Sequence, residues 1–259
     1  MGVLNVTPDS FSDGGKFNRL DLAVKHIDSM LENGADIIDI GAESSKPGSE
    51  PVSPSSQIKK IEPVVEAIRE ISNIPISIDT RSSEVIKKLT KYNINIVNDI
   101  SSLEDEDLYD VIKENQLYVS LMHMQGTPKN MQDNPKYDNL IDDIYHYLEG
   151  KVKRCLDYEI PRKKIIIDPG FGFGKTLDHN YILLNNLTKF SKIGCRILSG
   201  ISRKSMIGNV INKPASERLY GSLAATIIAI KNGASILRVH DVKETKMLLN
   251  FIDLIPSEL

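Results

Sequence analysis

Short runs of β-branched residues alternate with longer amphipathic segments along the whole 259-residue chain, and this alternation most constrains its fold. The runs are GVLNV (2–6), DIIDIGA (36–42), PISID (75–79), INIVNDI (94–100), YVSLMHM (118–124), KIIIDPG (164–170), RILSGIS (196–202) and ILRVHDV (236–242). Apolar residues at helical spacing occupy 21–34, 54–72, 84–93, 107–116, 139–158, 177–190, 216–234 and 243–255. The pattern predicts a single (β/α)8 TIM barrel over residues 1–259, with its active site at the carboxyl ends of the strands.

Bulk composition narrows the class of protein. With 41% hydrophobic and 26% charged residues the chain is typical of globular proteins, and a net charge of −3 gives no reason to expect nucleic acid or an acidic membrane as a partner. Cys155 and Cys195 are too few for a disulfide framework, and no signal peptide or membrane-length apolar stretch is present. We therefore expect a cytoplasmic protein. The first strand begins almost at Met1 and leaves no segment to plug the barrel, so we expect a truncated front end or an upstream segment.

Nearly every predicted strand ends in a polar side chain. These residues are Asn5, Asp39, Asp79, Asn98, His123, Asp168, Ser202 to Lys204, Arg238 and His240. Singly, each has a structural explanation: Asp79 could cap a helix and His123 could be a packed core histidine. Barrel geometry brings the whole set to one mouth, which favours a functional site.

The set divides into two chemical groups. Asp79, Asn98 and Asp168 offer planar acceptors or amides that suit the N–H edge of a heteroaromatic ring. Lys204, Arg238 and His240 come from the last two strands, where many barrels bind phosphate. Asn5 could help to hold a hard cation such as Mg²⁺, whereas no His/Cys cluster suggests zinc.

Three loops add to this mouth. TPDSFSDGGK (7–16) and ESSKPGSEPVSP (43–54) are rich in Gly, Pro and Ser, and both could close over a substrate. DPGFGFGKT (168–176) ends like a nucleotide-binding P-loop, but Pro169 stands where that motif needs a glycine. The chain is therefore not expected to be a P-loop NTPase, and the GKT ending is interpreted as a coincidence.

Several long motifs follow one another along the chain: GVLNVTPDSFSDGG, GADIIDIGAESSKPG, SIDT, NDI, LMHMQGTPKNMQ, DPGFGFGK, SRKSMIG, ERLYGSLA and RVHDVKET. In this order they resemble the dihydropteroate synthase family of folate biosynthesis. The resemblance implies a transferase in which p-aminobenzoate displaces pyrophosphate from 6-hydroxymethyl-7,8-dihydropterin pyrophosphate, and which sulfonamides inhibit. It also implies a homodimer and a Mg²⁺ cofactor.

The resemblance assigns roles by motif position. The implied pterin residues are Asp79, Asn98, Ile100, Met122, Asp168 and Lys204. The implied pyrophosphate residues are Asn5, Ser45, Arg238 and His240, with Asn5 also the Mg²⁺ ligand. The implied aminobenzoate and sulfonamide pocket comprises Phe11, Ser45, Lys46, Pro47, Phe173 and Ser202. Catalysis itself falls to Asp39, Lys204, Arg238 and His240.

The family loop usually reads GGESTRPG, and this chain departs from it at Ser45 and Lys46. Ser45 keeps a hydroxyl without the methyl, and Lys46 keeps a charge without the bidentate fork of arginine, so we expect weaker binding of aminobenzoate. The alternatives are a pterin-binding methyltransferase barrel and a catalytically inactive pterin-binding paralogue. A pyrophosphokinase could precede the chain, as in some bifunctional proteins.

Overall fold

Eight parallel strands follow one another in chain order in the computed structural model, which describes residues 1–6 and 16–254, with the backbone alone for 16–19. The strands are β1 (Gly2–Asn5), β2 (Ile38–Gly41), β3 (Ile76–Asp79), β4 (Ile96–Asp99), β5 (Tyr118–Met122), β6 (Ile165–Asp168), β7 (Arg196–Ser199) and β8 (Ala234–Leu237). The α-helices are α1 (Lys16–Glu32), α2 (Pro54–Ile71), α3 (Ser83–Leu89), α4 (Asp107–Glu114), α5 (Leu140–Asp157), α6 (Leu177–Asn185), α7 (Ser205–Ile211), α8 (Leu219–Lys231) and α9 (Val242–Ile252).

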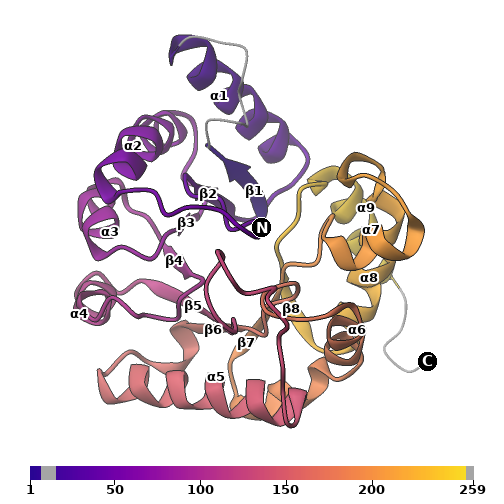
Figure 1. The fold of residues 1–259 in the computed structure, drawn as a ribbon. Coiled ribbons are helices and arrows are strands. Elements are labelled where there is room, and N and C mark those ends of the chain that lie inside the picture. The colour runs from indigo at the N-terminus through magenta and orange to yellow at the C-terminus, as the bar shows by residue number, and fades with distance from the viewer. Residues whose placement is uncertain (7–15, 255–259) are drawn as a thin grey trace.

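The sheet closes on itself. Beyond the end of β8, the Val239 amide donates to the Met1 carbonyl at 2.9 Å, and the Val3 amide donates to the Val239 carbonyl at 3.0 Å. Gly2 therefore bridges Val239 on one side and pairs with Ile38 on the other. The helices surround the strands as an outer ring (Figure 1). The predicted TIM barrel is confirmed.

The period-two alternation of each strand separates two sets of side chains. Ile38 and Ile40 of β2 join the core between the strands and the helices, where they meet the apolar face of α2 around Ile61 and Ile68. Asp39, between them, points into the barrel and is 0% exposed. The strands thus bury an apolar outer face while aiming polar groups along the barrel axis.

The amino-terminal end of the barrel is filled by side chains of the strands themselves. Met1, Ile96, Ile166 and Leu198 form a buried cluster there, against which Ile37, Tyr118 and Ile236 pack. Inward-pointing residues of the strands therefore supply packing at this end, and the expected upstream segment stays a prediction.

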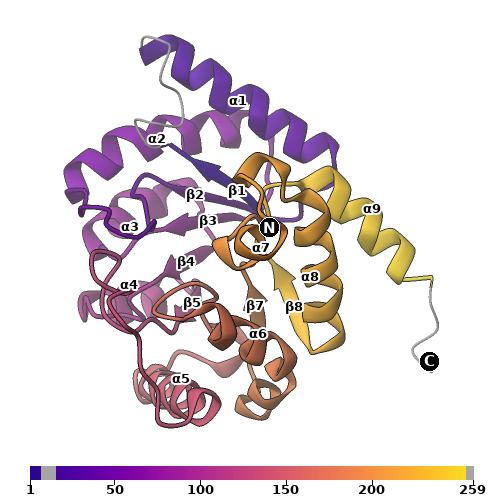
Figure 2. The same ribbon diagram turned by 45° about the vertical axis from the view of Figure 1, so that its right-hand side comes forward.

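The chain between β7 and β8 differs from the sequence prediction. It contains two helices, α7 and α8, where one was expected, and they lie beside α9 at one side of the barrel (Figure 2). The helix α7 has only seven residues and carries Gly208, and a Cβ there would overlap the guanidinium of Arg218. So short a segment with an internal glycine gives a weak helical pattern. No helix in the described ranges has the length and apolar composition needed to cross a membrane.

Candidate active site

Polar side chains from six strands meet at the carboxyl end of the barrel. Asp79 and Asp168 are the last residues of β3 and β6, and Asn98 lies in β4. Arg238 directly follows β8, and Lys204 directly precedes α7, beyond β7. Asn5, the last residue of β1, is exposed at the same end. The structure therefore brings together the predicted ring-binding and anion-binding residues.

Arg238 connects the buried carboxylates at this mouth. Its Nε donates to Asp39 Oδ2 at 2.7 Å, and its Nη2 donates to Asp79 Oδ2 at 2.8 Å. The Asn98 amide also donates to Asp39, at 3.3 and 3.4 Å to its two oxygens. Asp39 thus accepts hydrogen bonds from both Arg238 and Asn98, and its own side chain is fully buried.

The charges of this group depend on burial. Burial raises the pKa of Asp79 to about 7; Arg238 lowers it, while Asp39 and Glu43 raise it further. Burial alone would lower the pKa of Arg238, but Asp39 and Asp79 outweigh that effect and hold it above its usual value. Arg238 is consequently a permanent cation, and Asp79 can change its protonation near neutral pH.

The turn after β6 forms a second wall of the mouth. Asp168 Oδ1 accepts a hydrogen bond from the Gly170 amide at 2.7 Å, which fixes the carboxylate. Lys204 Nζ donates to the Phe171 carbonyl and lies 4.4 Å from the centre of the Phe173 ring. Burial lowers the pKa of Lys204 to about 8, against the effect of Asp168, so its ammonium form dominates at neutral pH.

An apolar surface adjoins these polar groups. Ile100, Met122, Met131 and Phe173 form one buried cluster, with Met124 packed against it. Ile100, Met122 and Phe173 were predicted site residues, whereas the two additional methionines lie in the loop after β5. Sequence analysis missed them because nothing in LMHMQGTPKNMQ indicates which of its methionines turns inward.

Ser202 and His240 meet beside Arg238 and Lys204, two of the predicted anion-binding residues. The His240 amide donates to Ser202 Oγ at 3.2 Å, and its ring Nδ1 lies 3.1 Å from the same oxygen. Burial lowers the pKa of His240 to about 4, with Arg238 and Arg203 contributing, so the ring is neutral at physiological pH. It can therefore donate a hydrogen bond to an anion but adds no charge.

The loop between β2 and α2 is tied to two neighbours. Glu43 forms an ion pair with Arg81 and accepts from Gln57 Nε2 at 3.1 Å. Further along, the Gly48 amide donates to the Pro128 carbonyl at 2.9 Å, and Glu50 pairs with Lys129 at 2.8 Å. These last two contacts join this loop to the one between β5 and α5.

Other predicted residues lie in less defined positions. Ser45 is half-buried on the β2–α2 loop, where Lys46 and Pro47 are exposed. Phe11 lies outside the described residues. His123 does not belong to the mouth: it is buried, and its Nδ1 lies 3.0 Å from Lys175 Nζ. Burial lowers the pKa of His123 to about 2, with Lys175 contributing, as for a packed core histidine.

The described side chains fit a Mg²⁺ ion only if substrate and water supply most of its ligands. No group of three or more His, Cys, Asp or Glu side chains within 1–6 and 16–254 is arranged to hold a metal ion. Asn5 supplies a single amide oxygen at the mouth. Because Mg²⁺ commonly keeps several waters and binds through substrate phosphates, one protein oxygen fits that mode of binding, whereas an all-protein cage does not.

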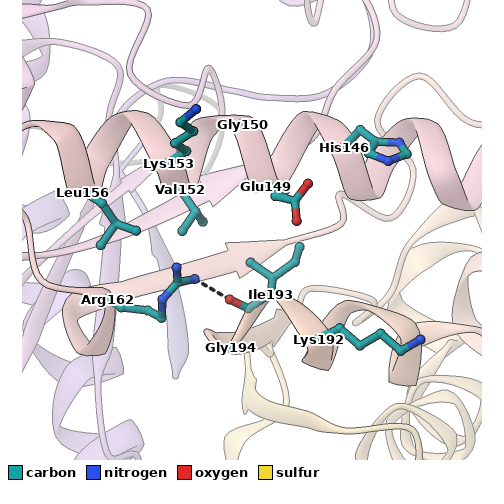
Figure 3. Close-up of a pocket in the computed structure, with 10 residues that line it drawn as sticks. All are labelled: His146, Glu149, Gly150, Val152, Lys153, Leu156, Arg162, Lys192, Ile193 and Gly194. Atoms are coloured by element: carbon teal, nitrogen blue, oxygen red, sulfur yellow. Dashed lines mark hydrogen bonds between the residues drawn. The ribbon is translucent and has the colours of Figure 1, made fainter.

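Two surface cavities lie elsewhere. One, of about 650 Å³, is lined by His146, Glu149 and Val152 of α5 and by Arg162, Ile193 and Gly194 (Figure 3). Another, of about 290 Å³, includes Leu117 and Lys164. Arg162, Gly194, Leu117 and Lys164 all precede strands, so both cavities belong to the end of the barrel opposite the mouth.

This combination of barrel and mouth matches known proteins. Residues 1–240 match the family described as pterin binding enzyme. The dihydropteroate synthase of Escherichia coli K12 is 48% identical over 253 residues, which cover 98% of this chain and 90% of that protein. The chain belongs to the dihydropteroate synthase family. The predicted family and its transferase class are confirmed.

Solved structures of dihydropteroate synthases agree with this result. A Yersinia pestis enzyme in complex with a sulfonamide drug superimposes with a TM-score of 0.92 at 45% identity, over 98% of this chain and 92% of that chain. A Clostridium difficile enzyme in the presence of pteroic acid has a TM-score of 0.92 at 38% identity, over 98% and 94% of the two chains. The similarity therefore extends across the whole barrel.

Proposed function

We propose that this chain condenses 6-hydroxymethyl-7,8-dihydropterin pyrophosphate with p-aminobenzoate, giving 7,8-dihydropteroate and pyrophosphate. The observation that carries the proposal is the mouth of the barrel, where ring-binding acceptors and anion-binding donors lie side by side. The Clostridium difficile relative was solved with pteroic acid, a compound that joins a pterin to aminobenzoate.

The pterin would bind within the barrel. Asp79, Asn98 and Asp168 present acceptors and an amide toward its N–H edge, while Met122 and Ile100 supply an apolar face. Asp168 is already oriented by the Gly170 amide, so it can accept paired hydrogen bonds without rearranging. Lys204, next to Asp168, would bind an acceptor atom of the ring.

The pyrophosphate would bind above the ring. A guanidinium has five N–H donors, and Asp39 and Asp79 accept from Nε and Nη2 of Arg238, so other donors of Arg238 can reach an anion. His240 adds a neutral donor, and Ser45 a hydroxyl from the loop. Mg²⁺ bound with Asn5 would neutralise charge on the leaving group.

The chemistry needs little proton transfer from the protein. The C–O bond next to the electron-rich dihydropterin can break first, leaving a cationic ring that the Asp39 and Asp79 carboxylates stabilise electrostatically. The aryl amine is neutral at physiological pH and attacks without a strong base. Phe173, Ser202, Lys46, Pro47 and Phe11 would position the amine, so that binding geometry supplies much of the rate.

The deciding experiment measures pyrophosphate release with and without aminobenzoate and with and without Mg²⁺. Release that requires Mg²⁺ and gives dihydropteroate supports the proposal. Binding of the pterin without release or product would instead indicate an inactive pterin-binding paralogue, and methyl transfer to a corrinoid would indicate the methyltransferase alternative. The anion-binding residues Lys204, Arg238 and His240 favour the synthase.

We also propose a homodimer that uses the helices after β6. Large apolar side chains are exposed on α6 to α9, among them Tyr181, Ile228, Met247 and, at 83% and 66% exposed, Tyr220 and Phe251. Such a concentration is typical of an interface between subunits. Light scattering should give a dimer for the native chain and a monomer for a Tyr220→Glu, Phe251→Glu variant. A cytoplasmic location and an upstream pyrophosphokinase stay predictions.

A further inference from the structure

Lys175 belongs to the GKT ending that resembles a P-loop, yet its side chain does not face an open loop. It is 3% exposed and lies directly before Thr176, the residue that caps α6. A buried lysine is costly unless its charge is compensated, so its surroundings indicate what it does.

The Lys175 ammonium group meets three acceptors, which matches its three N–H donors. It donates to the Phe173 carbonyl at 3.0 Å and, less closely, to the His123 carbonyl at 3.4 Å. The third partner is His123 Nδ1, at 3.0 Å. His123 follows β5 and Phe173 belongs to the turn after β6, so one side chain fastens two neighbouring loops together.

The backbones of these two loops are in direct contact. A Cβ atom at Gly174 would lie 2.7 Å from the Gln125 carbonyl oxygen and 2.8 Å from the Gln125 amide nitrogen. A Cβ atom at Gly170 would overlap the His123 carbonyl oxygen. The contact is therefore closed to side chains on the β6 side. Lys175 adds buried polar bonds across it, beside those that Tyr137 Oη donates to the Gly174 carbonyl at 2.6 Å and Gln132 Nε2 donates to the Gly172 carbonyl at 2.5 Å.

Lys175 also acts on the charge of Asp168. Burial raises the pKa of Asp168, and Lys204, the Gly170 amide, Lys175 and Arg238 lower it in that order. Lys204 precedes α7 and Arg238 follows β8, so of these three cations Lys175 is the one beside His123 and the β5–α5 loop. Burial lowers the pKa of Lys175 itself well below its usual value; Asp168 opposes that shift, and Lys204 adds to it.

We propose that Lys175 is a positioning residue of the pterin and aminobenzoate sites, which holds the β6–α6 turn against the β5–α5 loop. This rests on the proposed synthase reaction. Through the turn, Lys175 sets the position of Phe173, and through its charge it sets the fraction of Asp168 that can accept hydrogen bonds from the ring. It touches neither substrate.

The test replaces Lys175 with Met, which keeps the apolar stem without donors or charge. We expect the KM values for the pterin pyrophosphate and for aminobenzoate to rise by about tenfold, with kcat changed by no more than about twofold, because several charge-assisted hydrogen bonds are lost away from the leaving group. The acidic limb of kcat/KM should move to higher pH, because Asp168 loses a neighbouring cation.

Two controls separate this role from simple stabilisation. Thr176→Ala removes a hydrogen bond of 3.2 Å that caps α6 but none of the bonds of Lys175, and Lys192→Met removes a positive charge from the opposite end of the barrel. Both variants should be folded, as shown by a cooperative thermal unfolding transition, and both should have the wild-type pH profile of kcat/KM. If Lys175→Met loses thermal stability alone, with unchanged KM values and an unchanged acidic limb, the proposal is wrong.

If Lys175→Met does not fold, Lys175→Arg and Lys175→Gln decide. Arginine keeps the positive charge, so the acidic limb of kcat/KM should stay at its wild-type pH. Glutamine keeps two N–H donors without the charge, so the acidic limb should move to higher pH. Equal pH profiles of kcat/KM for the two variants would refute the assignment. If the wild-type chain makes no product, the proposed reaction fails instead. The same variants are then compared by calorimetric titration with the pterin pyrophosphate as a function of pH.

Discussion

Substituting Gly174 by alanine tests how closely the two loops at the mouth must fit. Gly174 has a φ of +60°, where an L-residue costs about 1 kcal/mol, and its Cβ would lie within 2.8 Å of the Gln125 backbone. Gly48 is the matched control: its φ is +81°, and no atom of the residues that the structure describes lies within 4 Å of a Cβ there. Both variants bear the cost of the left-handed backbone, and only Gly174→Ala must also separate the loops.

The magnitude follows from this difference. Forcing an extra methyl into a packed site costs roughly 1–3 kcal/mol, so Gly174→Ala should lose about 3 kcal/mol of unfolding free energy against about 1 for Gly48→Ala. In a domain of this size each kcal/mol lowers Tm by about 2–4 °C, which predicts a Tm difference of about 4–8 °C between the two variants.

Calorimetric melting of both purified variants at one protein concentration measures that difference directly. Gly174→Ala should also raise the KM for aminobenzoate, since Phe173 lies in the displaced turn. Equal Tm values for the two variants would refute the reasoning, because the loops would then separate without cost.

Four further predictions concern the mouth itself. Because burial raises the pKa of Asp79 to about 7, its carboxylate is lost as the pH falls through 7; pterin binding should weaken below that value, and Asp79→Asn should abolish this pH dependence in a titration. The raised pKa also means that between about pH 4 and pH 7 the folded chain retains a proton on Asp79 that the unfolded chain releases. The contribution of Asp79 to the free energy of unfolding is therefore largest below about pH 4 and is lost as the pH rises through 7. Urea unfolding at several pH values measures this change. Glu43→Gln removes the ion pair with Arg81 and should raise the KM for aminobenzoate several-fold with little change in Tm; an unchanged KM would show that this pair does not hold the loop. The double substitution Ser45→Thr, Lys46→Arg should lower the same KM, and steady-state kinetics showing no change would contradict the expected weakness of this loop.

Much of the fold followed from the periodicity of the sequence, because β-branched runs and amphipathic helices have different periods. All eight strands were located, although the last begins at Ala234, two residues before the predicted run, and ends before Arg238. The helix α7 escaped notice because it is short and contains Gly208, whose role depends on Arg218, ten residues further along the chain.

The site was predictable only to the level of strand ends. A position at the end of a strand places a residue near the mouth, but it does not say which neighbour the side chain meets. His123 has such a position and nevertheless turns to Lys175, 52 residues away. The contacts of Glu43 with Arg81 and of Gly48 with Pro128 join distant loops in the same way, and local pattern carries no signal for such pairs.

The two halves of the mouth differ in how freely they can evolve. The proposed pterin side is made of strand ends whose buried carboxylates, lysine and arginine depend on one another, so a substitution there endangers folding as well as the proposed reaction. The β2–α2 loop, with Ser45 and the exposed Lys46 and Pro47, can vary at little cost to stability. With the proposed assignment of the two substrates, an inhibitor that imitates aminobenzoate would depend on the more changeable half, whereas one that imitates the pterin ring would leave the protein few substitutions that escape it.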